Sequence, residues 1–311
     1  MSSIPFVTLV GTGNDFVLVD AMRRAVTPPR GDWPALAQAM CDPAHGAGTD
    51  GLLVLSRSDA ADVRMRIFNP DGSEASMCGN GIRCLAWYAH RRGVVGREMT
   101  IETGAGVKRA VIKGQAQVRI DMGVPRFIRH LPTLAVAGKT LSHLDVVDSG
   151  VPHLVWWVRD VARVPLEALG PPLRHHRSLG APGANVDAVQ VRSATRAVDR
   201  VREGVVHRVR LKMRTYERGV EGETQACGTG SVAATAAFIH TVPFETTLGR
   251  ESDVVWFEAT VRVPGGVLRV DVGAKYCFDT RQLCFSHAYL EGEAHQISSG
   301  EFSLNGRSRL G

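Results

Sequence analysis

A short glycine-flanked cysteine motif occurs twice in this chain, each time at the same place in a strand-to-helix transition. The first copy is Cys78-Gly-Asn-Gly81 and the second is Cys227-Gly-Thr-Gly230. A β-like run precedes each copy, and a segment rich in Ala, Leu, Val and Ile follows it, at Ile82–His90 and Ser231–His240. Because the whole order is repeated, we predict a duplicated α+β architecture with a cysteine at the start of one helix in each half.

A cysteine at a helix start lies beside backbone N–H groups that have no partner within the helix, and at the positive end of the helix dipole. That position favours thiolate over thiol and can cradle an anion. The dipole contributes up to about 2 kcal/mol, which lowers a free cysteine pKa from about 8.5 to about 7, so a nearby base is needed to complete the activation. Two such thiols indicate one site with a thiol on each side of a substrate. That geometry removes a proton from one face of a carbon and returns one to the other.

The remaining four cysteines show no Cys-x-x-Cys pair and no Cys/His grouping at zinc spacing, so we predict no metal site. We interpret Cys41, Cys84, Cys277 and Cys284 as packing thiols, since free cysteine is usually buried.

The elements expected in the two halves follow the same order, and we place the halves at 1–128 and 129–287. In the first we expect strands at Phe6–Val10, Phe16–Asp20, Gly51–Leu55, Val63–Phe68, Met99–Glu102, Gly106–Lys113 and Gln117–Met122, with a helix at Trp33–Met40. In the second we expect strands at Leu144–Asp148, His153–Val158, Val186–Val191, Val205–Tyr216, Val254–Val263, Val267–Val272, Leu283–Phe285 and Ala288–Glu291, with a helix at Leu166–Arg174. On this register Gly13–Phe16 corresponds to Gly150–His153. Residues 241–253 and 273–287 show no regular pattern.

Charge and hydropathy exclude several classes of function. The formal charge of +6 comes from scattered arginine, and no basic run is interleaved with aromatic residues, so we expect no nucleic-acid binding. No apolar run is long enough to span a bilayer, and Met1–Val10 does not resemble a signal peptide. We therefore expect a cytoplasmic protein without membrane contact. The oligomeric state is left open, with a homodimer as one alternative.

Two cofactor sites were considered. Gly11-Thr-Gly13 lacks a third glycine and opens no helical pattern, so we reject a dinucleotide loop. No lysine stands in a pyridoxal-type context. The sequence therefore predicts chemistry without a cofactor.

A set of motifs, in order along nearly the whole chain, resembles the diaminopimelate epimerase family. They are Gly11-Thr-Gly-Asn-Asp-Phe-Val17, Gly48-Thr-Asp-Gly-Leu-Leu53, Arg66-Ile-Phe-Asn-Pro-Asp-Gly-Ser-Glu74, Met77-Cys-Gly-Asn-Gly-Ile-Arg-Cys84, Pro152-His153, Ala184-Asn-Val186 and Tyr216-Glu-Arg-Gly219 with Ala226-Cys-Gly-Thr-Gly230. The resemblance implies cofactor-free conversion of LL-diaminopimelate to the meso isomer, for lysine and cell-wall synthesis. It implies two pseudo-symmetric domains, each a sheet wrapped around a central helix, with the site in the cleft between them. It also implies that a strand at 288–303 returns to the first domain, which leaves 304–311 as a polar, basic tail.

The resemblance also implies roles for individual residues. Cys78 and Cys227 would be the acid/base pair, and His153 and Glu217 the bases that set their protonation. Further residues would hold the substrate by its charged groups or cradle its reacting carboxylate through backbone N–H groups: Asn14, Asn69, Asn185, Glu217 and Arg218 in the first role, and Gly79, Asn80, Gly228 and Thr229 in the second. The glutamates four residues ahead of each cysteine, Glu74 and Glu223, are expected to brace the cysteine loops.

Two departures from the family pattern lie on the substrate side. Val151 stands where many members carry Asn, and Val220-Glu221 makes the following loop one residue longer. Both departures affect how the chain would recognise the distal end of the substrate. The nearest alternative function is therefore a racemase or epimerase of another amino acid on the same fold. A thiol redox protein is a second alternative, and it predicts a resolving cysteine and turnover with peroxide or dithiol.

Overall fold

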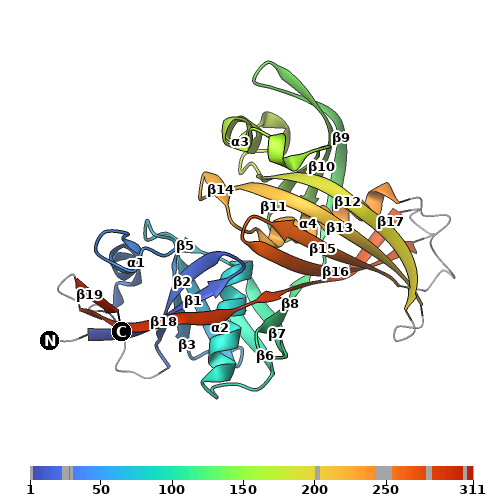
Figure 1. Ribbon diagram of the computed structural model, residues 1–311. Coiled ribbons are helices and arrows are strands. Elements are labelled where there is room, and N and C mark those ends of the chain that lie inside the picture. Colours follow the sequence, from blue (N-terminus) through green and yellow to red (C-terminus); the bar gives the residue numbers. More distant parts are fainter. Residues whose placement is uncertain are drawn as a thin grey trace. The chain divides into compact units, whose positions relative to one another are not determined.

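The computed structural model describes residues 3–22, 28, 31–199, 204–242, 254–277, 282–303 and 307–310 (Figure 1). The chain forms two compact units: unit 1 comprises 1–120 with 291–311, and unit 2 comprises 121–290. The chain leaves unit 1 within strand β8 and returns to it within strand β17. Unit 1 is therefore discontinuous in sequence, while unit 2 is one stretch. None of the helices in the described residues is long and apolar enough to cross a membrane.

Unit 1 contains strands from both ends of the chain. Its elements are β1 (Ser3–Gly11), β2 (Asn14–Asp20), α1 (Trp33–Cys41), β3 (Leu52–Ser56), β4 (Val63–Phe68), β5 (Glu74–Ala75), α2 (Gly79–Arg91), β6 (Glu98–Thr103), β7 (Gly106–Lys113), the start of β8 (Gln117–Gly123), β18 (His295–Ser303) and β19 (Arg307–Leu310). Strand β18 pairs antiparallel with β1, and β19, within the segment expected as a tail, pairs with the end of β18.

Unit 2 repeats the plan with longer strands. Its elements are β9 (Arg126–Val136), β10 (Lys139–Asp148), β11 (Pro152–Trp157), the 3-10 turn η2 (Val161–Arg163), α3 (Leu166–Arg174), the 3-10 turn η3 (Arg177–Leu179), β12 (Asn185–Asp199), β13 (Gly204–Glu217), β14 (Gly222–Thr224), α4 (Gly228–Thr241), β15 (Val255–Val263), β16 (Gly266–Cys277) and most of β17 (Gln282–Glu293).

The predicted repeat is confirmed at the level of strand pairing. In unit 1, β2 runs parallel to β3, β3 antiparallel to β4, β4 antiparallel to β5 and parallel to β6. In unit 2, β11, β12, β13, β14 and β15 pair in the same way and order. Helices α1 and α3 occupy the parallel crossovers, which cannot be closed by a tight turn. The α+β class and the pseudo-symmetric halves expected from the sequence are therefore correct.

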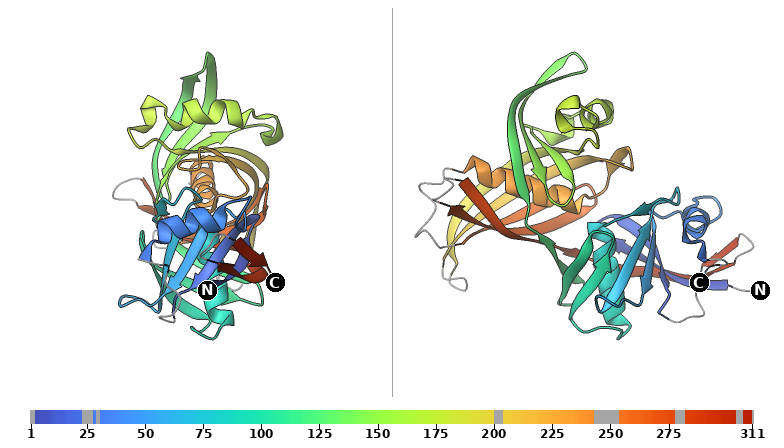
Figure 2. Two further views of the ribbon diagram at one scale, coloured as in Figure 1. Left: turned by 90° about the vertical axis from the view of Figure 1, so that its left-hand side faces the viewer. Right: turned by 180° about the vertical axis from the view of Figure 1, so that it is seen from behind.

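Each unit wraps its strands around the helix that follows its cysteine (Figure 2). Helix α2 packs against β1, β2, β3, β4, β7 and β18, and α4 packs against β9, β10, β11, β12, β15 and β16. Helix α4 is buried on nearly all sides, because small residues such as Ala233, Ala234, Ala236 and Ala237 let the surrounding strands approach closely. The sheets therefore fix the position and direction of each central helix.

The helices begin earlier than the apolar pattern predicts. Both α2 and α4 start directly after the cysteine, three residues before Ile82 and Ser231. Glycine has low helix propensity, so the first turn carries little signal in the sequence. Strand β9 is a further difference from the sequence-based expectation, which contained no strand there. The segment 241–253 lies mostly outside the described residues.

The cysteine predictions are confirmed in part. Cys41 and Cys84 are buried free thiols, and burial raises the pKa of Cys41 to about 11 and that of Cys84 to about 12. Cys284 is disulfide-bonded, so its interpretation as a packing thiol is wrong. The side chain of Cys277 lies outside the described residues.

Candidate active site

Cys78 and Cys227 are the N-cap residues of α2 and α4, as the duplicated motif predicts. Both have extended backbones, and the Sγ of each accepts a hydrogen bond from the second glycine of its motif. Gly81 N lies 3.4 Å from Cys78 Sγ, and Gly230 N lies 3.3 Å from Cys227 Sγ. Each sulfur thus takes the place of the usual capping oxygen and lies at the positive end of a helix dipole.

The second glycine of each motif is required by close approach of a strand. A Cβ atom at position 81 would lie 2.9 Å from Cδ2 of Leu53. A Cβ atom at position 230 would lie 2.5 Å from Oδ1 of Asp187. The first turn of each helix therefore touches the strand behind it, which holds the cysteine at a fixed depth.

An arginine–glutamate pair braces each cysteine loop. In unit 1, Arg66 donates from Nε to Oε1 of Glu74 at 2.7 Å and from Nη2 to Oε2 at 2.8 Å. In unit 2, Arg214 and Glu223 form the same two-pronged contact. The expectation that Glu74 and Glu223 brace the loops is confirmed, and their arginine partners were not foreseen.

Of the predicted binding residues in unit 1, two contact each other. Asn80 Nδ2 donates to Asn14 Oδ1 at 2.6 Å, and Asn14 Nδ2 donates to Asp50 at 2.8 Å. Asn69 takes no part in these two hydrogen bonds. It lies in a turn where its Nδ2 donates to Ser73 Oγ at 2.9 Å. Asn14 and Asn80 are thus linked at the α2 N-terminus beside Gly79, while Asn69 stabilises the turn that precedes the motif.

Arg83 is a further residue of this half-site that the sequence reasoning did not single out. Its side chain is fully buried, and its guanidinium donates to Gly79 O at 2.8 Å, Asn80 Oδ1 at 2.7 Å and Thr12 Oγ1 at 2.8 Å. Burial lowers its pKa to about 10. Arg83 therefore ties the first turn of α2 to the β1–β2 turn. Its position inside the Cys78 motif, on an otherwise apolar helix face, was the available signal.

In unit 2, Glu217 at the end of β13 contacts the cysteine directly. The Cys227 thiol donates a hydrogen bond to the Glu217 carboxylate. Burial, followed by the negative charges of Glu217 and Asp187, raises the pKa of Cys227 well above its usual value. Burial likewise raises the pKa of Glu217. The expected lowering of the thiol pKa is therefore wrong for Cys227, because desolvation and two carboxylates outweigh the helix dipole.

His153 on β11 lies in the same group, together with an aspartate that the sequence reasoning missed. His153 Nδ1 is 2.7 Å from Oδ2 of Asp187, and both side chains are fully buried. A ring nitrogen of His153, a carboxylate oxygen of Asp187 and Cys227 Sγ lie within 4.8 Å of one another. Asn185 Nδ2 lies 3.4 Å from His153 Nε2. The two ring nitrogens of His153 are therefore in contact with Asp187 and Asn185, respectively.

The loop after β13 carries the remaining predicted residues. The Arg218 backbone N–H donates to Asn185 Oδ1 at 2.7 Å. Glu221, part of the lengthened loop, binds the buried Arg174 of α3, with Oε1 3.1 Å from Nη2, while Val220 is exposed. The extra residue is thus absorbed in a loop held on α3. Gly228 and Thr229 form the first turn of α4, and Thr229 Oγ1 lies 3.4 Å from Cys227 Sγ.

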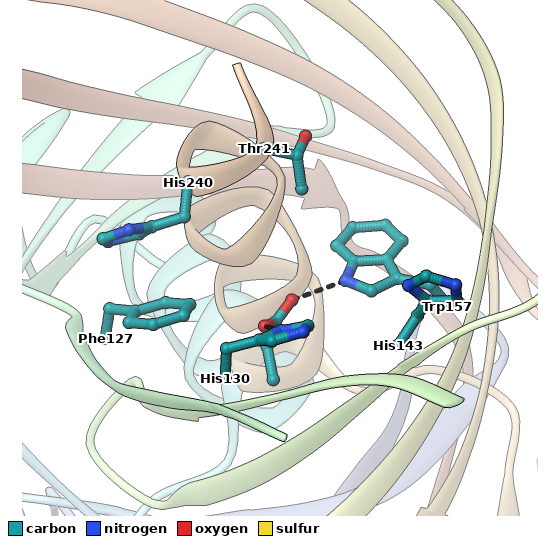
Figure 3. Close-up of a pocket in the computed structure, with 7 residues that line it drawn as sticks. Phe127, His130, His143, Trp157, His240 and Thr241 are labelled. Carbon is teal, nitrogen blue, oxygen red and sulfur yellow. Dashed lines mark hydrogen bonds and ion pairs between the residues drawn. The ribbon is translucent and has the colours of Figure 1, made fainter. Parts of the chain in front are cut away.

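A cavity of about 420 Å³ in unit 2 contains none of these residues (Figure 3). It lies at the C-terminal end of α4, about 20 Å along the helix from Cys227 by the rise per residue. The Asp145 carboxylate in its wall accepts from Trp157 Nε1 at 2.6 Å and lies 2.8 Å from His130 Nδ1. Both carboxylate oxygens are therefore occupied. The candidate residues lie instead at the N-terminal end of α2 in unit 1 and, separately, at that of α4 in unit 2.

Comparison with known proteins identifies the family of the chain. The family model described as diaminopimelate epimerase matches residues 6–128 and 146–275. A diaminopimelate epimerase of Moorella thermoacetica is 37% identical over 316 residues, covering 96% of this chain and 99% of that protein. One of Methanothrix thermoacetophila is 36% identical over 312 residues, covering 97% of each.

Solved structures of lower identity share the fold. A phenazine biosynthesis protein of the PhzF family from Bacillus anthracis superposes with a TM-score of 0.67 at 18% identity, covering 98% of this chain and 100% of that one. A probable proline racemase from Agrobacterium radiobacter K84 superposes with a TM-score of 0.64 at 17% identity, covering 97% and 93%. The duplicated fold is thus shared by proteins with different names.

Proposed function

The chain belongs to the diaminopimelate epimerase family, and from that premise we propose that it is an isomerase that converts LL-2,6-diaminopimelate to the meso isomer. The reaction uses the two cysteines as acid and base, without a cofactor, and serves lysine and peptidoglycan precursor synthesis. The observation that carries the proposal is the pair of cysteines that cap α2 and α4 in equivalent surroundings. A single reactive thiol would not require a second copy of that arrangement.

Inversion at a carbon requires one group to remove a proton and another to supply one from the opposite face. Cys227 is held as a thiol beside the Glu217 carboxylate, which suits it to supply a proton and to be reprotonated through Glu217. Cys78 then removes the substrate proton, and the two roles exchange in the reverse direction. Glu217 and His153 serve as the bases that set the protonation state of the two cysteine thiols.

The acidity of the α-hydrogen arises from backbone donors. As the α-carbon loses its proton, negative charge moves onto the adjacent carboxylate. The N–H groups of Gly79, Asn80, Gly228 and Thr229 lie in the first turns of α2 and α4, where such groups have no partner within the helix. Donors placed where charge develops stabilise the transition state more than the ground state.

The distal end of diaminopimelate carries an ammonium and a carboxylate, and both need partners. Val151 offers no side-chain hydrogen bond, so we assign this end to Asn69, Asn185 and Arg218, with Asn14 as a further polar contact. A two-pronged arginine–carboxylate contact is among the stronger ones available to a protein. Leaving such a charged group without a partner costs about 1–3 kcal/mol or more. Glu221 holds the lengthened loop on Arg174, which keeps the backbone next to Arg218 in place.

Exchange of the α-hydrogen in D₂O tests the proposal. LL-diaminopimelate should be deuterated and epimerised, with a kcat/KM well above those for lysine, glutamate, histidine and proline. Cys78→Ala and Cys227→Ala should each retain less than about a thousandth of the wild-type rate with an unchanged fold. A higher kcat/KM for a monocarboxylic amino acid would indicate a racemase of that amino acid. Turnover with peroxide, in the absence of exchange, would indicate a thiol redox protein.

A cytoplasmic location is part of the proposal. Both Cys78 and Cys227 are free thiols, and the proposed reaction needs them in that state. The cytosol keeps most protein thiols reduced, so the disulfide at Cys284 is an exception to this expectation. Fractionation followed by thiol labelling tests this, with both cysteines expected to be alkylated in the cytosolic fraction without prior reduction.

A further inference from the structure

Three buried polar side chains form a continuous network across adjacent strands of unit 2. His153 on β11 contacts Asp187 on β12 through Nδ1 and Oδ2, 2.7 Å apart. Thr215, opposite Asp187 in the antiparallel β12–β13 register, donates from Oγ1 to the other carboxylate oxygen at 2.7 Å. His153 and Asp187 are fully buried and Thr215 is 2% exposed. Both oxygens of Asp187 therefore have a partner, and one of them is the imidazole.

The neighbouring hydrogen bonds assign the tautomer of that imidazole. Asn185 Oδ1 accepts from the backbone N–H of Arg218 at 2.7 Å, and this donor fixes which end of the amide is the oxygen. The Asn185 Nδ2 group then faces His153 Nε2 at 3.4 Å, so Nε2 must be the acceptor. In a neutral ring the proton is consequently on Nδ1, where it is donated to Asp187. Nε2 is left as the basic nitrogen.

The internal repeat shows that the fold does not need these polar groups. In unit 1 the equivalent positions on β2, β3 and β4 hold Phe16, Leu53 and Ile67: Leu53 pairs with Ile67 as Asp187 pairs with Thr215. Leu53 also lies against the second glycine of its cysteine motif, as Asp187 does. All three unit 1 side chains are buried. Apolar residues thus fill this place in one copy, while a hydrogen-bonded trio fills it in the other.

We propose that Asp187 is a positioning residue that holds His153 in the Nδ1-protonated tautomer, so that Nε2 serves as the base in thiol proton transfer. The inference rests on the proposed function and deepens it by assigning a role to a residue outside the cysteine motifs. Glu217 from β13 and Cys227 at the start of α4 are the other titratable groups that interact with this network in the described part of the chain. Asp187 acts through His153, because its carboxylate is enclosed and both of its oxygens have a partner.

The Asp187→Asn variant changes the donor presented to Nδ1 while it preserves the size of the side chain. Because Thr215 still donates to the amide oxygen, an N–H group faces Nδ1 and drives the ring to the Nε2-protonated tautomer. We expect kcat to fall at least about a hundredfold, with KM changed by less than about threefold. The matched control Thr215→Val removes the hydroxyl but leaves the His153 contact, and kcat should stay within about tenfold of wild type. An equal loss in both variants would overturn the proposal.

Long-range ¹H–¹⁵N spectra of histidine-labelled protein give a readout that is independent of activity. The His153 signals are identified by their absence in His153→Gln. Wild type and Thr215→Val should show a protonated Nδ1 and an unprotonated Nε2, and Asp187→Asn the reverse. A protonated Nε2 in neutral wild-type His153 would overturn the proposal even if the Asp187 and Thr215 variants failed to fold. Absence of diaminopimelate exchange with the expected tautomer would count against the proposed function alone.

Discussion

Arg214 and Glu223 are joined by two parallel hydrogen bonds, Nε to Oε1 at 2.6 Å and Nη2 to Oε2 at 2.5 Å. Nη1 of the same guanidinium donates to the carbonyls of Val161 and Val164 at 3.1 and 2.9 Å. The pair in unit 1, Arg66–Glu74, has the same geometry. Its glutamate side chain is more exposed to solvent, at 45% for Glu74 compared with 19% for Glu223. Solvent screens the unit 1 pair more strongly, so the two equivalent braces should differ in strength.

Glu223→Gln should therefore destabilise the protein more than Glu74→Gln. We expect a loss of about 1–3 kcal/mol for the first, typical of hydrogen bonds to charged groups, and about 0–1 kcal/mol for the second. Urea unfolding of both variants measures the difference, and high salt should reduce the smaller effect further. Equal losses would show that burial of the brace is unimportant.

Gly230→Ala should damage the unit 2 half-site through a steric contact. The added Cβ would lie 2.5 Å from Asp187 Oδ1 and 3.2 Å from Cys227 Sγ, so the helix start or the carboxylate must shift. Overpacking of this kind typically costs about 1–3 kcal/mol, and the displaced thiol should lower kcat. Gly96→Ala is the control, since the nearest atom to its Cβ is 3.8 Å away. Wild-type activity of Gly230→Ala would contradict the close approach described for β12.

Glu217→Gln should change the pH dependence of stability. Burial raises the pKa of Glu217, outweighing the hydrogen bond from Cys227 and the attraction of His153. The folded state then binds the proton more tightly than the unfolded chain, so the contribution of Glu217 to stability falls as pH rises above the unfolded value of about 4.5. Thermal unfolding should show the Tm of the variant, relative to wild type, increasing between pH 5 and pH 8. Activity should be lost throughout.

Glu221→Gln provides a control in which the pH dependence of stability should change in the opposite direction. Burial raises the pKa of Glu221, but the Gly219 N–H and the Arg174 guanidinium outweigh it and hold the pKa below its usual value. Its stabilising contribution is therefore present at neutral pH and lost in acid. The Tm of this variant relative to wild type should become more negative as pH rises to about 5 and then stay level up to pH 8. Parallel slopes for the two variants would contradict the environments described for them.

Arg83→Lys should be destabilising although it preserves the charge. The guanidinium reaches three acceptors on different elements, namely Gly79 O, Asn80 Oδ1 and Thr12 Oγ1, and a lysine ammonium cannot reproduce that planar fork. At least one acceptor would be left buried without a partner, at a cost of at least about 1–3 kcal/mol. The exposed Arg57→Lys is the control, and urea unfolding is the measurement. A stability equal to wild type would show that a lysine serves all three acceptors.

The parts of the fold that the sequence predicts are those with a strong local pattern. The duplicated strand order and the two N-cap cysteines follow from periodicity and from a motif that occurs twice. Strand β9 was missed because its polar side chains, such as Arg126, Arg129 and His130, are mostly exposed and give no clear alternation. The apolar pattern begins three residues after each helix start, because Gly79 and Gly228 are weak helix formers and the first turn therefore carries little signal.

The parts of the site that escaped prediction depend on partners distant in sequence. In the local sequence, Asp187 is a single polar residue within an apolar strand. Only the pairing of β11 with β12 places it next to His153. The raised pKa of Cys227 depends on the enclosure of Glu217 and Asp187 beside the thiol. A helix dipole can be inferred from a motif, whereas desolvation requires the surrounding strands.

The pairing of β1 with β18 has a consequence for biosynthesis. During translation β1 leaves the ribosome before all of unit 2, and the strand that completes its outer edge leaves after it. Unit 2 is one uninterrupted stretch, so the nascent chain has all of it before unit 1 can close. Until β18 emerges, β1 presents an unpaired edge next to the sheet that positions Cys78. A ribosome-bound intermediate thus carries a finished Cys227 half and an unfinished Cys78 half.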